Sequence, residues 1–239
     1  MLVEYVGLPG SGKSTLLSAT NKQLKALDIP YMSLFRRAPQ LSVEKLGASR
    51  RKSTTWKLAS ANATQFVSVD AYLRHLDLVQ AVSPHLREVD ARYDYFQTLV
   101  AHDVLLGSEG EDHIITIDEG LIHRTARLAQ NHPKDLIPFS ANMLAVGAII
   151  VLDLAPEIAL ERATARFAQD DKQQDQRQKF GTIQDIKTGY LPFIDGAVQQ
   201  AKSQGTPVLR VDATQSVDSN AALISGTLAR LFHERQSHA

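Results

Sequence analysis

The feature that most constrains this chain is the stretch 7-GLPGSGKST-15, which follows the short apolar run 2-LVEYV-6. It completes the pattern G-x-x-x-x-G-K-[ST], whose glycines let the backbone curl so that several N–H groups point inward at phosphate oxygens. Lys13 is expected to reach the β- and γ-phosphates of a nucleotide, and the Ser14 hydroxyl to bind Mg²⁺. The alternative is a glycine-rich turn with a surface lysine, and the position of the loop between a strand and a helix disfavours it. Nucleotide binding is therefore predicted for Gly7, Leu8, Pro9, Gly10, Ser11, Gly12, Lys13, Ser14 and Thr15.

Five short runs rich in Val, Ile or Leu, without polar alternation, are typical of strands in a parallel sheet that is covered on both faces. Segments with helical periodicity separate them, and this alternation indicates a doubly wound α/β fold. We therefore predict the three-layer α/β/α fold of P-loop NTPases, with a five-stranded parallel sheet in the order 2-3-1-4-5. The predicted strands are Leu2–Val6, Tyr31–Leu34, His113–Ile117, Ala148–Leu152 and Pro207–Val211.

The segments between these runs repeat hydrophobic residues at the three- and four-residue spacing of helices. A first helix is expected from about Lys13 to Leu27, where it adds the positive end of its dipole to the loop. No internal repeat and no Pro/Gly/Ser linker divides the chain, so residues 1–239 are predicted to form a single domain. The other helical patterns are Phe66–Leu76, Leu86–Val100, Leu121–Leu128 and Leu136–Val146, the last ending at Gly147.

The composition excludes several classes of site. Lys+Arg and Asp+Glu each total 26 in 239 residues, so the formal net charge is zero and nothing favours nucleic acid or an anionic membrane as a partner. Cysteine is absent, which excludes disulfides, thiolate metal sites and cysteine nucleophiles. No leader pattern and no apolar run of membrane-spanning length is present. We expect a cytoplasmic protein with neither a nucleic-acid nor a membrane partner.

Acidic residues follow the predicted strand 113–117 in the stretch 117-IDEG-120. A carboxylate that ends a buried strand beside a P-loop can hold Mg²⁺ through its water shell, and Asp118 is the better placed of the two. Glu119 could orient an acceptor hydroxyl or a water molecule. The structural alternatives are an N-cap for Asp118 and a first-turn acid of the next helix for Glu119.

A pair of arginines follows the fourth predicted strand in 151-VLDLAPEIALERATARF-167. Pro156 suits the first turn of a helix, so Arg162 and Arg166 fall at positions i and i+4 on one face. Two like charges stacked in this way favour an anionic partner, such as the phosphates in transfer, whose developing charge they would stabilise. The alternative is a solvated face on which Asp170 neutralises Arg166.

Several stretches in the second half of the chain resemble a known family. The run L-D-x-x-P-E-x-A-L-E-R-x-x-x-R, the polar segment after it, Phe180, 189-GYL-191 and the closing 211-VDATQSVDSNAALI-224 are similar to the second half of thymidylate kinases. The resemblance implies a nucleotide-kinase-like fold in which 162–180 is a lid-like segment, with its tip at 169–179 and with Arg162 and Arg166 on the lid side. It also implies that the loop formed by Asp212, Ala213 and Thr214 lies beside the adenine.

The middle of the chain departs from the pattern of thymidylate kinases. Those enzymes carry Asp-Arg after the third strand, where this chain has Asp118-Glu119. They carry Arg-Glu-Pro after the second strand, where 37-RAP-39 replaces the acid with Ala38. These positions serve the acceptor side of the family's site, so an acceptor other than thymidylate is expected.

The helical region 35–107 supplies the acceptor side in that family. Arg36 and Arg37 follow the second strand, at the edge where ligands gather in α/β sheets, and one of them could bind an anionic acceptor or lie in a basic loop facing solvent. The stretch 90-DARYDY-95 mixes carboxylates, an arginine and tyrosines. Its members Asp90, Arg92 and Asp94 could bind hydroxyl groups of a sugar or nucleoside, or form an ordinary exposed turn of helix.

Two functions are compatible with these features. The first is an ATP- and Mg²⁺-dependent kinase with Lys13, Asp118, Glu119, Arg162 and Arg166 as its catalytic residues and a small molecule as phosphoryl acceptor. The acid that receives the acceptor's proton is Asp118, Glu119 or one of those in 90–94. The second is a P-loop ATPase or nucleotide-dependent switch that acts with a protein partner. The sequence is also compatible with a homodimer.

Overall fold

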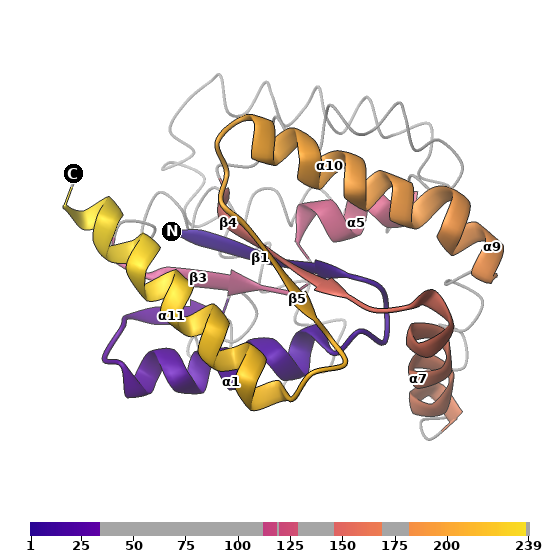
Figure 1. Cartoon of the computed structure of the whole chain (residues 1–239), viewed down its shortest axis with the longest axis horizontal. Coiled ribbons are helices and arrows are strands. Elements are labelled where there is room, and N and C mark those ends of the chain that lie inside the picture. Colours follow the sequence, from indigo (N-terminus) through magenta and orange to yellow (C-terminus); the bar gives the residue numbers. More distant parts are fainter. Residues whose placement is uncertain (34–111, 119, 129–145, 169–181, 238–239) are drawn as a thin grey trace, which may run out of the picture.

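The computed structural model describes residues 1–33, 112–118, 120–128, 146–168 and 182–237. Within them the chain forms a five-stranded parallel sheet in the order β2-β3-β1-β4-β5, which confirms the predicted fold and strand order (Figure 1). The strands are β1 (Leu2–Gly7), β2 (Tyr31–Ser33), β3 (Ile114–Ile117), β4 (Val146–Asp153) and β5 (Val208–Asp212).

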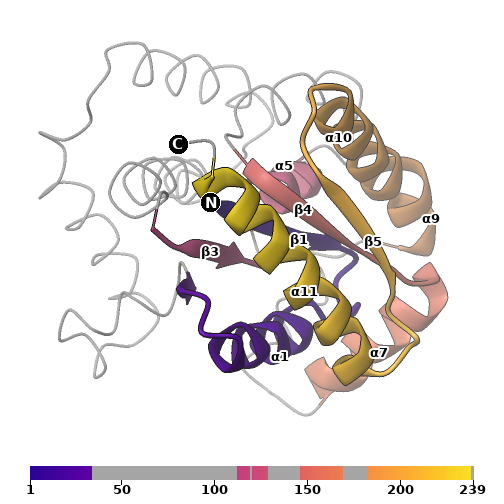
Figure 2. The ribbon, with the colours of Figure 1, turned by 60° about the vertical axis from the view of Figure 1, so that its left-hand side comes forward.

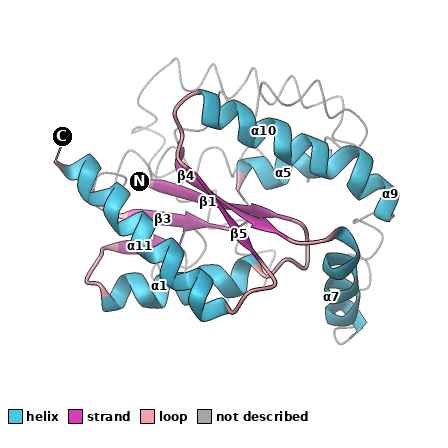
Figure 3. Ribbon diagram, in the orientation of Figure 1, coloured by secondary structure: helices cyan, strands magenta, loops and turns pink. Residues whose placement is uncertain are grey.

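Helices cover both faces of the sheet and complete the three layers (Figure 3). α1 (Lys13–Ala26) and α11 (Val217–Gln236) cover one face, and α5 (Leu121–Leu128) and α10 (Leu191–Ser203) cover the other. The strand arrows point toward the edge at which α7 (Pro156–Ala168) lies (Figure 2). In the described chain, α9 (Ile183–Asp185) and the π-helical turn η6 (Ile186–Tyr190) precede α10.

β1 is the central strand, and its alternate side chains serve both layers. Leu2 and Val6 are buried with the residues of α5 and α10, whereas Val3 and Tyr5 are buried with those of α1 and α11. A strand covered on both faces gains from apolar residues at every position, at about 1.5–3 kcal/mol for each large side chain buried. This explains why the apolar runs lack the alternation of a half-exposed sheet.

Polar contacts hold the outer strands. The Asn21 amide of α1 donates to Thr116 Oγ1 of β3 at 3.2 Å, and Thr116 Oγ1 donates to the Met32 carbonyl of β2 at 3.3 Å. At the other edge, Arg210 Nη2 on β5 donates to Asp153 Oδ1 on β4 at 2.6 Å. The buried pair fixes β3 against α1, whereas the half-exposed ion pair contributes at most about 1 kcal/mol.

One sequence prediction about β4 is wrong. The helical pattern 136–146 does not end at Gly147, because Val146 and Gly147 both belong to β4. The register of β4 against β1 shifts here, from Leu2–Val146 to Val3–Ala148, so Gly147 is the extra residue of a bulge. A Cβ on Gly147 would lie 2.1 Å from Met1 Cγ, so the glycine leaves room for Met1 in the core rather than terminating a helix.

The remaining boundaries lie within two residues of the predicted ones, and α5 covers the predicted 121–128. The region 35–107, the tip 169–179 of the lid-like segment and most of 136–146 lie outside the described residues. In the part of the chain that the structure describes, no helix combines the length and the apolar character needed to cross a membrane.

Candidate active site

The glycine-rich loop leaves β1 at the carboxyl edge of the sheet, between β3 and β4. Gly10 and Gly12 have φ values of 84° and 90°, a left-handed conformation that residues with a Cβ rarely adopt. Gly12 is the N-cap of α1 and provides no side-chain cap. The first-turn N–H groups of α1 have no acceptor within the helix, so they face the loop without a cap, as phosphate binding requires.

Gly10 also packs against α7. A Cβ on Gly10 would lie 2.2 Å from the Ala159 carbonyl oxygen and 3.0 Å from the Ala163 nitrogen, so only glycine allows the loop to lie this close to the helix. The first two turns of α7 are therefore held directly against the loop. Sequence reasoning assigned Gly10 to the curl of the loop and did not anticipate this contact.

Lys13, the first residue of α1, is 8% exposed and turns back into the loop. Its Nζ donates to the Gly7 carbonyl at 2.9 Å and to the Leu8 carbonyl at 3.0 Å. The ammonium group therefore lies against the inner backbone of the curl. A buried positive charge at a helix N-terminus makes this part of the loop strongly attractive to an anion.

Ser14 and Asp118, which are 104 residues apart, meet at the edge of the sheet. Ser14 Oγ donates to Asp118 Oδ2 at 2.5 Å. The structure thus brings together the two residues predicted to hold Mg²⁺. Asp118 is not an N-cap, because α5 begins at Leu121 after Gly120. The first turn of α5 contains no acid, and Glu119 lies outside the described residues.

A hydroxyl and a carboxylate fit the preference of Mg²⁺ for oxygen ligands. Among the described residues, no group of three or more His, Asp or Glu side chains gathers in a way that could hold a metal ion. Two protein oxygens are nevertheless a suitable set for Mg²⁺ beside a nucleotide, because that ion keeps several waters and takes phosphate oxygens as further ligands.

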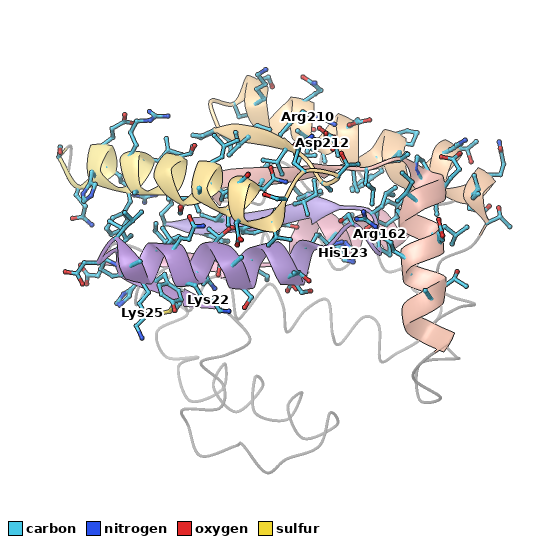
Figure 4. All side chains as sticks on the ribbon, turned by 60° about the horizontal axis from the view of Figure 1, so that its bottom comes forward. Lys22, Lys25, His123, Arg162, Arg210 and Asp212 are labelled. Carbon is cyan, nitrogen blue, oxygen red and sulfur yellow. The ribbon has the colours of Figure 1, made fainter. Side chains whose placement is uncertain are left out.

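α7 carries the predicted arginines and begins at Pro156, as the sequence indicated. Arg162 is exposed and projects from α7 toward the end of the sheet (Figure 4). Arg162 lies three residues after Ala159, one of the residues that contact Gly10, so the two are neighbours on the helix surface. Arg166 follows one turn later on the same face, and its side chain lies outside the described part.

The loop after β5 lies at the same edge and is held by its own side chains. Asp212 Oδ1 accepts from the Thr214 N–H at 2.8 Å and from the Thr214 hydroxyl at 2.6 Å. Asn220 of α11 donates to the Asp212 carbonyl at 2.8 Å. The hydrogen bonds from the Thr214 hydroxyl, the Thr214 N–H and Gln215 lower the pKa of Asp212. Asp212, Ala213 and Thr214 therefore form a preorganised turn.

Several predicted site residues have no described position. The structure thus relates Lys13, Ser14, Asp118, Arg162 and the turn 212–214 to one edge, and leaves the acceptor side as predicted from the sequence. The residues outside the described part are Glu119, Arg36, Arg37, Asp90, Arg92 and Asp94.

A buried polar group behind this edge was missed by sequence reasoning. Glu4 is fully buried in β1, and its Oε1 accepts from the His123 N–H at 3.1 Å. The Tyr190 hydroxyl and His123 Nδ1 share a buried hydrogen bond of 2.7 Å. No motif marks His123 or Tyr190. The available signal was Glu4 itself, a carboxylate in the middle of an otherwise apolar strand, where it needs a partner.

Comparison with known proteins gives distant structural likenesses. No family model matches the chain, and no curated protein matches its sequence. A solved structure of a deoxyadenosine kinase from M. mycoides, with the products dCMP and a flexible dCDP bound, aligns with a TM-score of 0.48 and 16% sequence identity. The alignment covers 96% of this chain and 100% of that chain. A likeness at this level carries no inference about substrate.

Proposed function

We propose that this chain is an ATP-dependent kinase that transfers the γ-phosphoryl group of Mg-ATP to a nucleotide, nucleoside or other small metabolite. The observation that carries the proposal is the contact between Gly10 and the backbone of Ala159 and Ala163. It ties the phosphate loop to the helix that bears Arg162 and Arg166. A loop that only stored a nucleotide would not need two arginines on the helix packed against it, whereas phosphoryl transfer uses such charges in its transition state.

The glycine-rich loop binds the triphosphate. The N–H groups of Gly10, Gly12, Lys13 and Ser14 and the dipole of α1 hold the phosphate oxygens, since the left-handed glycines turn the backbone inward and no side chain caps the helix. Lys13 Nζ moves from the Gly7 and Leu8 carbonyls, 2.9 and 3.0 Å away, to the β- and γ-phosphates. The ammonium group then donates to charged phosphate oxygens in place of two neutral carbonyl oxygens, and hydrogen bonds between charged groups are stronger.

Mg²⁺ fits the Ser14–Asp118 pair, with Ser14 as a direct ligand and Asp118 acting directly or through a bound water. When bound, the ion neutralises negative charge on the β- and γ-phosphates. Asp118 accepts the Ser14 hydroxyl proton in a hydrogen bond, which leaves a lone pair of Ser14 Oγ for the metal. The two residues therefore orient each other before any ligand arrives.

In the transfer step an acceptor oxygen forms a bond to the γ-phosphorus, and the bond from that phosphorus to the β–γ bridging oxygen breaks. ADP leaves with the electron pair, and Lys13 and Arg162 stabilise the charge that moves onto the bridging and terminal oxygens. An acceptor hydroxyl gives its proton to a carboxylate. The candidates are Asp118, Glu119 and the acids in 90–94, of which Asp118 is among the described residues.

The position of the acceptor, and the expectation that it is not thymidylate, rest on the resemblance to thymidylate kinases and on the departures at Ala38 and Glu119. The adenine of ATP lies beside the turn formed by Asp212, Ala213 and Thr214, and the acceptor binds on the opposite side, against 35–107. Because the acid of the Arg-Glu-Pro pattern is replaced, we expect an acceptor other than thymidylate.

An acceptor screen tests the function. The chain is incubated with Mg-ATP and, separately, with nucleosides, nucleoside monophosphates, sugars and aminocyclitols, and products are read by mass spectrometry. ATP consumption is expected to be slow alone and to accelerate with one class, with one phosphate added to that compound for each ADP formed. Rapid hydrolysis without any acceptor, stimulated by a protein partner, would instead establish a switch or motor ATPase.

A further inference from the structure

β1 carries a buried carboxylate just before the glycine-rich loop. Glu4 lies three residues before Gly7 on this strand and is fully buried, in line with Leu2 and Val6, which belong to the apolar cluster beneath α5 and α10. A carboxylate at the centre of an apolar layer costs free energy unless its charge is satisfied.

The task indicated by the contacts is to hold the start of α5. Glu4 Oε1 accepts from the N–H of His123, the third residue of the helix, at 3.1 Å. This is the hydrogen bond that an N-cap side chain normally makes. The helix has no acid in its first turn, and the residue before it is Gly120. A side chain from a neighbouring strand thus takes the place of the missing cap, and the helix dipole stabilises its negative charge.

Gly120 is shaped for this arrangement. A Cβ at that position would lie 2.4 Å from Glu4 Cδ and 2.6 Å from Glu4 Oε2, so the carboxylate fills the space beside the glycine. The opposite end of the contact is also fixed, since His123 Nδ1 and the Tyr190 hydroxyl share a buried hydrogen bond of 2.7 Å. Tyr190 ends the π-helical turn η6, an irregularity often retained for a specific contact.

Asp118 stands two residues before Gly120, where its carboxylate meets Ser14 at 2.5 Å. Only two residues separate Asp118 from α5, and the first turn of α5 is hydrogen-bonded to Glu4 of β1. The same strand leads directly into Gly7 and the loop that contains Ser14. Ser14 and Asp118, the two residues of the predicted metal site, are therefore both connected to β1.

We propose that Glu4 is a positioning residue that sets the orientation of Asp118 toward Ser14 and Mg²⁺ by capping α5 from β1. The inference rests on the proposed role of Asp118 in holding the metal. Partners that orient metal-binding groups in this way commonly change metal affinity by about 10–100-fold when they are removed.

The test uses ATP binding with and without metal, measured by calorimetry on the full-length chain in MgCl₂ or in EDTA. The ratio of the two affinities reports the metal site and needs no acceptor. Glu4→Gln keeps the shape and one acceptor oxygen but loses the charge, and we expect it to lower this ratio by about tenfold while ATP binding in EDTA stays unchanged. Glu234→Gln, the same change at an exposed position of α11, should behave as wild type.

A double variant separates positioning from general destabilisation. If Glu4 acts through Asp118, then Glu4→Gln/Asp118→Asn should show the same ratio as Asp118→Asn alone. Additive losses, or an unchanged ratio in Glu4→Gln beside a lowered one in Asp118→Asn, would overturn the inference. An unchanged ratio in Asp118→Asn would instead refute the metal role within the proposed function.

Gly120→Ala supplies a second approach if Glu4→Gln does not fold. Its methyl group must displace the Glu4 carboxylate, so the variant should reproduce the lowered ratio with the charge still present. A folded Gly120→Ala protein with the wild-type ratio would contradict the proposal. Thermal melts and circular dichroism establish which variants are folded.

Discussion

Two loops leave the same edge of the sheet, and they are built in opposite ways. The loop after β1 uses glycines with left-handed backbone and starts α1 at Gly12, which has no side chain to cap the helix. The loop after β5 uses side chains bonded to their own backbone, and Ser216 caps α11 by accepting from the Ser219 N–H at 3.1 Å. The first helix therefore has no side-chain cap on its N–H groups, whereas the second has one of them, the Ser219 N–H, capped by its own Ser216.

This difference agrees with the different tasks proposed for the two loops, although both lie where α/β proteins bind ligands. Uncapped N–H groups and the buried ammonium of Lys13 form a site for an anion. A self-bonded turn such as 212–214 has fewer groups to offer and serves as a rigid wall. The position of a loop in the fold is thus less informative than whether its backbone is already satisfied.

The largest expected effect comes from Lys13→Ala in the first loop. Loss of the ammonium that is to hold the transferring phosphates should lower kcat/KM by at least about 10³-fold with the fold retained. Steady-state kinetics and circular dichroism check this. Lys22→Ala, which removes an exposed lysine from the same helix (Figure 4), should leave both unchanged. Undiminished transfer by Lys13→Ala would refute the mechanism.

The second expected effect separates two glycines of the first loop. Gly10→Ala introduces a methyl 2.2 Å from the Ala159 carbonyl oxygen at a φ of 84°, so both strain and overpacking should lower the free energy of unfolding by about 3 kcal/mol. Gly12→Ala has nothing within 4 Å of its Cβ, and should cost about 1–2 kcal/mol from backbone strain alone.

Urea unfolding of the two variants measures this difference. Equal losses would mean that the contact between the loop and α7 is not tight in solution. Because that contact carries the proposal of phosphoryl transfer, the Gly10→Ala protein should also lose more turnover than its remaining folded fraction explains.

The smallest expected effect belongs to the second loop. Asp212→Asn keeps an oxygen that can accept from Thr214, so kcat should be retained with at most a few-fold rise in the KM for ATP. The folded pKa of Asp212 is lowered, so its charged hydrogen bonds contribute fully above its ordinary value of about 3.9 and are lost as the pH falls through the lower folded value.

NMR of the Thr214 amide resonance checks this pH dependence. The resonance should stay constant from neutral pH to about pH 4 and shift below it. The Asp212→Asn protein should show no such shift. A shift in the wild type that begins near neutral pH would contradict the assigned hydrogen bonds.

Much of the fold was predictable because local patterns determine it. Apolar runs gave the five strands, and Pro156 and the loop pattern marked the starts of α7 and α1. The wrong boundary at Gly147 shows that local sequence patterns do not reveal contacts between distant residues. That glycine is needed because Met1 packs against it from the neighbouring strand, a contact between residues far apart in sequence.

Part of the chemistry of the site could also be predicted from local sequence patterns. Lys13 and Ser14 belong to one contiguous motif, so their pairing with phosphate and metal follows from spacing alone. Asp118 could be singled out as an acid at a strand end, but its alternative as an N-cap was excluded only by the start of α5 at Leu121, and its contact with Ser14 was revealed only by the fold. The role of Glu4 was not predicted because its partner, His123 in the first turn of α5, is 119 residues away.

The sequence by itself therefore determined the α/β/α fold and the left-handed glycine-rich loop, since these depend on hydrophobic periodicity and on the conformational freedom of glycine. Only the tertiary structure decided which polar groups meet. Gly10 lies on α7, Ser14 meets Asp118, and Glu4 caps α5 because parallel strands bring distant segments to one edge at fixed register. Distances between side chains on different elements are set by packing, and spacing along the chain does not encode them.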